Sequence, residues 1–163
     1  MNFLEFSLLF LLLFWTGISA TRRDVTFPLA NDLKKVIRGY VFLRGSPDYE
    51  TARPVHNGGC RHIYPLIIVK PLSTEDVALT VRLARQYGVE LSVRSGGHSY
   101  QCTGTKQDSV HLDLRRLNKI EFRHPFHVVT LGPGAIFKNG KRSYLEKGSK
   151  YDYFNWQLFF FQF

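Results

Sequence analysis

Residues 65–100 read PLIIVKPLSTEDVALTVRLARQYGVELSVRSGGHSY, and this stretch carries the pattern that decides the fold. The short apolar run 65–69 predicts a buried strand. Residues 74–87 lack both Gly and Pro and predict a helix, and a second strand follows over 91–94. Strands joined by such a crossover run parallel, so the sequence predicts an α/β fold in which the two strands pair.

Both ends of the predicted helix carry recognisable signals. Ser73 and Asp76 resemble a capping box at the start, and Gly88 stands where a left-handed glycine commonly follows a helix. Three apolar residues are predicted to share the buried face: Val77, Val81 and Ala84. In the second strand, Leu91 and Val93 alternate with polar residues and are predicted to face the core.

Further elements are predicted on either side of this unit. Upstream, residues 29–39 predict a short helix with Asn31 as its cap, Leu33 and Ile37 on one face, and Gly39 at its end. Downstream, three short strands are predicted over 110–114, 120–123 and 127–131. Pro125 separates the last two in the manner of a hairpin.

The turn after residue 93 is the strongest candidate for a binding site. It comprises Arg94, Ser95, Gly96, Gly97, His98, Ser99 and Tyr100. Two adjacent glycines let the backbone approach a ligand, and successive N–H groups in such a turn attract an anion. The turn also follows the carboxyl end of a strand, where open α/β sheets bind ligands. Hydroxyl groups and one guanidinium suit a phosphate or pyrophosphate. The two glycines taken alone are a weak signal and favour a structural turn over a binding site.

Three segments taken together resemble a known family. They are YPLIIVKPLSTEDVALTVRLARQYGVELSVRSGGHSY at 64–100, SVHLDLRRLNKI at 109–120 and VVTLGPGA at 128–135. Their order and spacing resemble the FAD-linked oxidases with a PCMH-type FAD-binding domain, in the berberine-bridge-enzyme-like branch of the vanillyl-alcohol-oxidase superfamily. The resemblance implies the amino-terminal part of such a domain, over residues 21–137.

The resemblance also implies roles for individual residues. The Ser95–Ser99 loop, flanked by Arg94 and Tyr100, would hold the FAD pyrophosphate, and His98 would be joined covalently to the flavin. Gly132 and Gly134 match glycines that let the backbone approach the cofactor. The alternative for His98 is a loop histidine without a ligand. No residue is identified as a catalytic base or a substrate ligand.

The resemblance fades after Phe137, and two functions stay open. The first is an FAD-dependent oxidoreductase of the oxidase type, of which the chain is a portion too short to act alone, with a small-molecule substrate bound elsewhere. The second is a secreted, basic, non-catalytic binding module that keeps part of the fold. Residues 138–163 form a divergent tail, and its last 13 residues, 151–163, are rich in aromatic side chains. This end is interpreted as truncated, the alternative being a segment that docks to a partner or touches a membrane.

The first 20 residues predict a secretory signal peptide. Their apolar run, 8–15, is followed by small residues and is too short for a comfortable membrane span. The chain is therefore expected outside the cell or in the secretory lumen. The alternative is an uncleaved anchor, because the first positive side chains follow the apolar run.

The cysteines and the charged residues indicate which bonds, metals and partners to expect. Cys60 and Cys102 are the only cysteines, and in a secreted chain they predict one disulfide, the alternative being a free Cys102 thiol. Cys60-x-His62 and His124-x2-His127 lack further ligands, so no metal site is predicted. The net charge is +9, but Lys and Arg are scattered without aromatic stacking motifs, so nucleic acid is not an expected partner.

Overall fold

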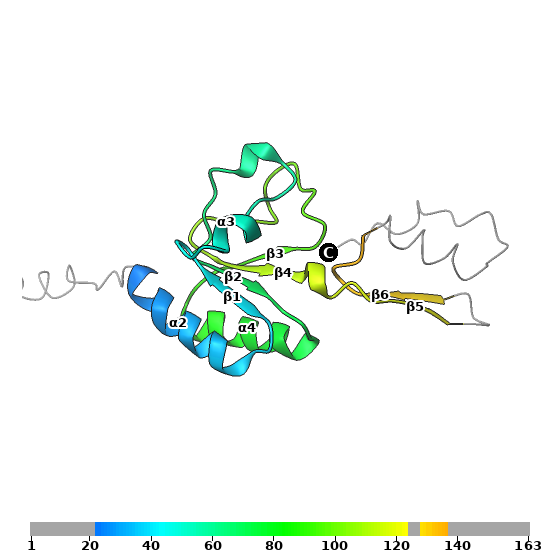
Figure 1. The fold of residues 1–163 in the computed structure, drawn as a ribbon, viewed down its shortest axis with the longest axis horizontal. Coiled ribbons are helices and arrows are strands. Elements are labelled where there is room, and N and C mark those ends of the chain that lie inside the picture. Colours follow the sequence, from blue (N-terminus) through cyan, green and yellow to red (C-terminus); the bar gives the residue numbers. More distant parts are fainter. Residues whose placement is uncertain (1–21, 124–127, 137–163) are drawn as a thin grey trace, which may run out of the picture.

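The structure is a computed structural model that describes residues 22–123 and 128–136. Its centre is a four-stranded sheet with the order β1-β2-β4-β3 (Figure 1). The strands are β1 Tyr40–Leu43, β2 Ile67–Lys70, β4 Val110–Asp113 and β3 Leu91–Arg94. β4 runs parallel to both β2 and β3, and β1 is antiparallel to β2. The predicted α/β class is confirmed.

The strand–helix–strand unit is confirmed with one correction. Helix α4, Thr74–Gln86, joins β2 to β3, and these strands point the same way. They do not pair with each other, because β4 lies between them and bonds to both. Sequence proximity predicts neighbouring strands only on average. All four residues of β4 are buried, as expected for a strand that has neighbours on both sides.

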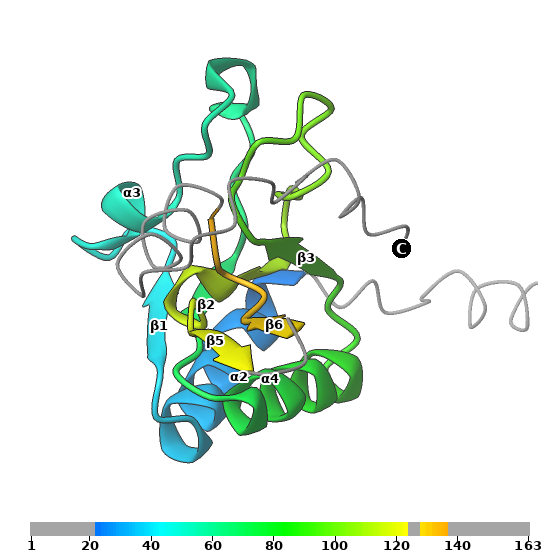
Figure 2. The same cartoon turned by 90° about the vertical axis from the view of Figure 1, so that its right-hand side faces the viewer.

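One face of the sheet is apolar and is covered by two helices. Helix α2, Arg22–Val36, and α4 lie together under this face (Figures 1 and 2). The core between helices and sheet consists of Leu29, Ala30, Leu33, Ile37, Leu66, Ile67, Val69, Ala84, Val89, Val110 and Leu112. Each helix therefore contributes one apolar stripe, as expected for helices on an α/β sheet.

The upstream helix was predicted with the wrong bounds. Helix α2 begins well before residue 29 and continues through Pro28, and Asn31 lies inside it instead of capping it. Leu33 and Ile37, predicted to share one face, are both buried in the same core, although Ile37 follows the last residue of α2. Pro28 is the seventh residue of α2, so it removes one helical hydrogen bond from the helix interior. Leu29 and Leu33, which follow it, are completely buried, and this burial opposes the local cost of the proline.

The predicted signals at the ends of α4 are confirmed. The Ser73 Oγ accepts a hydrogen bond from the Asp76 N–H at 3.1 Å, and Gly88 has a φ of +64°. The Asp76 carboxylate accepts from the backbone N–H groups of Leu72 at 2.8 Å and Arg38 at 3.0 Å. Asp76 thereby ties the start of α4 to the segment that follows α2.

Two apolar residues are more exposed than the periodicity predicted. Val81 is 42% exposed, and Thr80 takes the buried position with its hydroxyl donating to the Asp76 carbonyl at 2.7 Å. Val93 is 49% exposed, whereas its polar neighbours Ser92 and Arg94 are buried. The second face of the sheet is therefore not solvated, which an alternating pattern cannot reveal.

The second face is covered by irregular segments and one short helix, α3, Tyr49–Ala52 (Figure 1). Polar side chains dominate its buried positions, namely Ser92, Arg94, His111 and Asp113. Only a small apolar cluster lies here, made of Tyr49, Ala52 and Ile68 with Phe42 beside it. Hydrogen bonds must therefore hold much of this side together.

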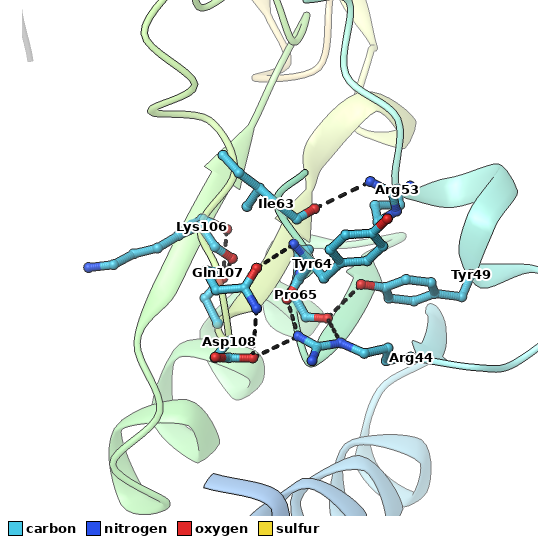
Figure 3. A network of polar contacts seen from close by, with 11 residues as sticks. Arg44, Tyr49, Arg53, Ile63, Tyr64, Pro65, Lys106, Gln107 and Asp108 are labelled. Carbon is cyan, nitrogen blue, oxygen red and sulfur yellow. Dashed lines mark hydrogen bonds and ion pairs between the residues drawn. The ribbon is translucent and has the colours of Figure 1, made fainter. Parts of the chain in front are cut away.

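A polar network joins the covering segments to each other (Figure 3). The Arg44 guanidinium donates to the Pro65 carbonyl at 3.2 Å and to the Asp108 carboxylate at 2.7 Å. The Tyr49 hydroxyl donates to the same Pro65 carbonyl at 2.6 Å. The Gln107 side chain accepts from the Tyr64 N–H at 2.7 Å. These bonds fix the segment before β2 against the loop before β4.

The last described elements form a hairpin beside the sheet. A 3-10 turn, η2 Leu114–Arg116, follows β4, and β5 Ile120–Arg123 pairs antiparallel with β6 Val128–Leu131. The predicted hairpin is confirmed, while Pro125 lies outside the described residues. Among the helices of the described part, none has the length and apolar character needed to cross a membrane.

Candidate FAD-binding site

A pocket of about 260 Å³ lies at the carboxyl end of β3. Its lining consists of Pro54, Val55, His56, Arg94, Gly96, Gly97 and Arg115. Three of these, Arg94, Gly96 and Gly97, belong to the predicted binding turn. The segment 54–56 was not singled out from the sequence, because nothing in a turn-rich stretch shows which other loop it will meet.

The shape of the turn disfavours a side chain at both glycines, by backbone conformation at Gly97 and by lack of room at Gly96. Gly97 has a φ of +77°, and a Cβ there would lie 3.1 Å from Arg94 Cδ. A Cβ on Gly96 would lie 2.7 Å from His98 Nδ1, closer than real contacts allow. The turn therefore exposes bare backbone next to a pocket, which is the arrangement that admits an anion.

The serine hydroxyls of the turn are engaged within the protein. Ser95 Oγ donates to the Pro133 carbonyl, and Ser99 Oγ contacts the Thr103 hydroxyl at 2.8 Å. Ser99 Oγ also accepts from the Thr103 N–H at 3.1 Å. Their cofactor contacts stay a prediction, and their visible role is to fix the turn.

The buried Arg94 side chain bonds the turn to the neighbouring segments. Its guanidinium donates to the Pro54 carbonyl at 2.6 Å and the Ala52 carbonyl at 3.0 Å, and it pairs with Asp113 at 2.6 Å. The side chains of Arg94 and Asp113 are each only 1% exposed. The buried Arg94 Nε has no hydrogen-bond partner among the described residues. Most of this guanidinium is thus used to join α3, β3 and β4.

The pocket is electropositive. Arg115 also pairs with Asp113, at 2.8 Å, and its side chain is partly exposed. Burial would raise the Asp113 pKa, but hydrogen bonds from Arg115 and Arg94 hold it below its usual range. Burial lowers the pKa of Lys70, and the nearby charges of Arg115, Arg94 and Arg116 lower it further. Two cations that line the pocket, Arg94 and Arg115, share the single Asp113 carboxylate, and the net positive charge that remains favours an anion such as a diphosphate.

A buried histidine lies beside this charged group. The His111 ring contacts Ser92 Oγ at 3.1 Å, and its Nε2 has no partner among the described residues. Burial lowers the His111 pKa to about 4, and the charge of Arg94 acts in the same direction. His111 is therefore neutral at pH 7 and belongs to the polar layer beneath the pocket.

His98 and Tyr100, at the far end of the turn, lie at the surface. Tyr100 is 93% exposed and is not among the residues that line this pocket. The His98 ring lies against the ring of His56, with 5.0 Å between the ring centroids. His56 was not predicted, and no spacing rule connects it to the turn.

The predicted disulfide is confirmed. Cys60 and Cys102 are bonded, with 5.6 Å between their Cα atoms. Cys60 ends η1, Gly58–Cys60, and Cys102 follows the binding turn, so the bond joins the two segments that border the pocket. Because Cys60 is in the disulfide, it is not available to a Cys60–His62 metal site. His124 and His127 lie outside the described residues.

Gly132 and Gly134 have a packing role. A Cβ on Gly132 would lie 2.1 Å from the Leu117 carbonyl oxygen, and one on Gly134 would lie 2.0 Å from that of Leu114. These glycines let the end of the hairpin pass close to η2. The packing of Gly132 and Gly134 against η2 does not test whether their backbone approaches the cofactor, which stays a prediction.

Comparisons with known proteins agree with this geometry. Residues 65–155 match the family described as FAD binding domain. A relative from Gibberella zeae, the FAD-linked oxidoreductase aurO, is 35% identical over 99 residues, which are 61% of this chain and 19% of that protein. The chain spans about a fifth of the length of the curated relatives it matches.

Solved structures share the fold over most of the chain. The 6-hydroxy-D-nicotine oxidase of Arthrobacter nicotinovorans superposes with a TM-score of 0.64 at 32% identity, covering 69% of this chain and 24% of that one. A variant of BBE-like 1 from Physcomitrella patens has a TM-score of 0.60 at 26% identity, with coverages of 65% and 23%. The expected PCMH-type fold is confirmed for the matching part, and the chain belongs to the FAD binding domain family, whose cofactor is FAD.

Proposed function

We propose that the whole protein is an FAD-dependent oxidoreductase of the oxidase type. FAD accepts two electrons from a substrate when bound and passes them to an acceptor. The observation that carries the proposal is the bare Gly96–Gly97 turn beside an electropositive pocket, within a segment that belongs to the FAD binding domain family. The small-molecule substrate would be bound by parts of the protein beyond the described residues.

In this proposal the residues of the pocket have distinct tasks. The backbone of Gly96 and Gly97 and the Arg115 guanidinium bind the pyrophosphate, and Arg94 with Asp113 keeps the turn in place. His98 lies beside the pocket on the surface side and tethers the flavin. Its solvent-accessible ring supports this role, because a covalent bond needs a ring nitrogen that the flavin can approach.

The test uses the whole protein refolded with excess FAD. Wild-type protein should be yellow, and the colour should stay in the pellet after acid precipitation. A His98→Ala variant should bind FAD but release it on precipitation. His62→Ala is the matched control, because His62 is an exposed histidine of the neighbouring segment that does not line the pocket.

Two results would contradict parts of the proposal. Protein that binds no flavin at all would leave the basic, non-catalytic binding module as the better description. Protein that binds FAD but loses all of it on precipitation would remove only the tether at His98.

We also propose that the protein enters the secretory pathway. The disulfide between Cys60 and Cys102 supports an oxidising compartment. Secreted material should then begin near Thr21 when its amino terminus is sequenced. A membrane-bound product that keeps Met1 would support the uncleaved anchor instead.

A further inference from the structure

Two histidines from distant parts of the chain meet at the edge of the pocket. The rings of His56 and His98 are tilted by 50° with their centroids 5.0 Å apart. His56 lines the pocket, and His98 belongs to the turn that borders it. His98 itself is exposed.

Three bonds hold the two segments together around this ring contact. The His56 N–H donates to the Gly97 carbonyl at 3.2 Å, and the Asn57 side chain donates to the Tyr100 carbonyl at 2.9 Å. The disulfide between Cys60 and Cys102 adds a covalent link on the same side. The ring of His56 is thus presented to His98 by a braced segment rather than by a free loop.

The His98 ring is limited on a second side as well. Its Nδ1–Cε1 edge lies over Gly96, because a Cβ there would approach Nδ1 to 2.7 Å and Cε1 to 3.1 Å. The backbone of Gly96 and the ring of His56 therefore restrict the imidazole from two directions. Covalent reactions are fast only when the reacting atoms are held in a near-attack geometry, so such restriction favours a tether.

We propose that His56 is a positioning residue that fixes the His98 imidazole in the orientation needed to bond the flavin. This inference rests on the proposed function, because the orientation of His98 matters for attachment only if His98 bonds the flavin. The packing of the two rings does not require flavin. The packing of a flat ring carries the effect, so a phenyl ring in place of the imidazole should preserve it.

The first experiment needs no cofactor. In the chain labelled at histidine, nuclear Overhauser effects are expected between the ring protons of His56 and His98, and between His98 Hε1 and the Gly96 α protons. In His56→Ala the Gly96 contact should be lost as the His98 ring averages over rotamers. In His56→Phe it should return, and in the control His62→Ala it should stay unchanged.

The second experiment measures the rate of covalent attachment in the whole protein supplied with FAD. His56→Ala should slow attachment about tenfold to a hundredfold, since misplacing a reacting group by about 1 Å can cost about a hundredfold. His56→Phe and His62→Ala should stay within about twofold of wild type. Circular dichroism of each variant establishes that the fold is kept.

The possible outcomes separate this inference from the proposed function. If wild-type protein forms no covalent flavin, the tether at His98 is wrong, and the nuclear Overhauser effects alone decide whether His56 positions the ring. If His56→Ala keeps the Gly96 contact, or if His56→Phe behaves like His56→Ala in both experiments, the positioning role of His56 is wrong.

Discussion

The two faces of the central sheet are stabilised by different physics. The face under α2 and α4 is a continuous apolar core, whereas the opposite face has a buried Arg94–Asp113 pair, a neutral His111 and hydroxyl groups. The apolar face tolerates apolar side chains of suitable size, since dispersion and burial are not directional. The polar face demands particular partners, and it is the face that shapes the pocket.

The largest effect is expected from breaking the buried ion pair. Asp113→Ala leaves Arg94 charged and buried without a carboxylate, which should lower the free energy of unfolding by about 4 kcal/mol. Urea denaturation measures this change. Lys106→Gln, at the exposed Lys106–Glu90 pair, is the control and should cost less than about 1 kcal/mol. Equal losses of unfolding free energy in Asp113→Ala and Lys106→Gln would mean that the buried ion pair stabilises the fold no more than an exposed one.

On the apolar face, Leu33→Ala should cost about 3 kcal/mol, because it removes a fully buried side chain and leaves a cavity. The same denaturation experiment applies. Val81→Ala on the exposed side of α4 should change stability by about 0.5 kcal/mol at most. A large loss at Val81 would contradict its placement at the surface.

The polar face should also make stability depend on pH through His111. Its pKa of about 4 in the folded state lies below the ordinary value of 6.5, so protonation favours unfolding. The contribution is complete above about pH 6.5 and is lost as the pH falls toward 4, amounting to about 3 kcal/mol.

The comparison that isolates this effect uses His111→Gln. Unfolding free energies are measured at pH 7 and pH 4.5 for both proteins, and wild type should lose more between the two. Asp113 contributes little to that difference, because its loss begins only near the ordinary aspartate pKa and below. Identical pH dependence in the two proteins would place His111 in contact with solvent.

The smallest effect is expected at the start of α4. Ser73→Ala removes the side-chain acceptor of the Asp76 N–H and should cost about 1 kcal/mol. Ser73→Asp keeps an acceptor and should stay close to wild type in thermal unfolding. A loss as large for Asp as for Ala would show that the hydroxyl acts through another contact.

Much of the candidate site could be read from the chain because its signals are local. The turn from Arg94 to Tyr100 and its position after a strand were visible in the residues themselves. The sequence did not show that the Arg94 side chain is buried or that His56 lies beside the turn, because each contact is made with a segment about 40 residues away. Polar contacts between residues far apart in the chain produce no periodic pattern in the sequence.

By itself, the sequence determined the helix that starts after Ser73 and ends before Gly88, the short strands and the glycine turn, since caps, glycines and apolar runs act within a few residues. Only the tertiary structure decided that β4 lies between β2 and β3, that α2 continues through Pro28, and that Val93 is exposed while Arg94 is buried. Strand order and burial depend on which distant surfaces meet, and the free energy of that meeting outweighs local preference.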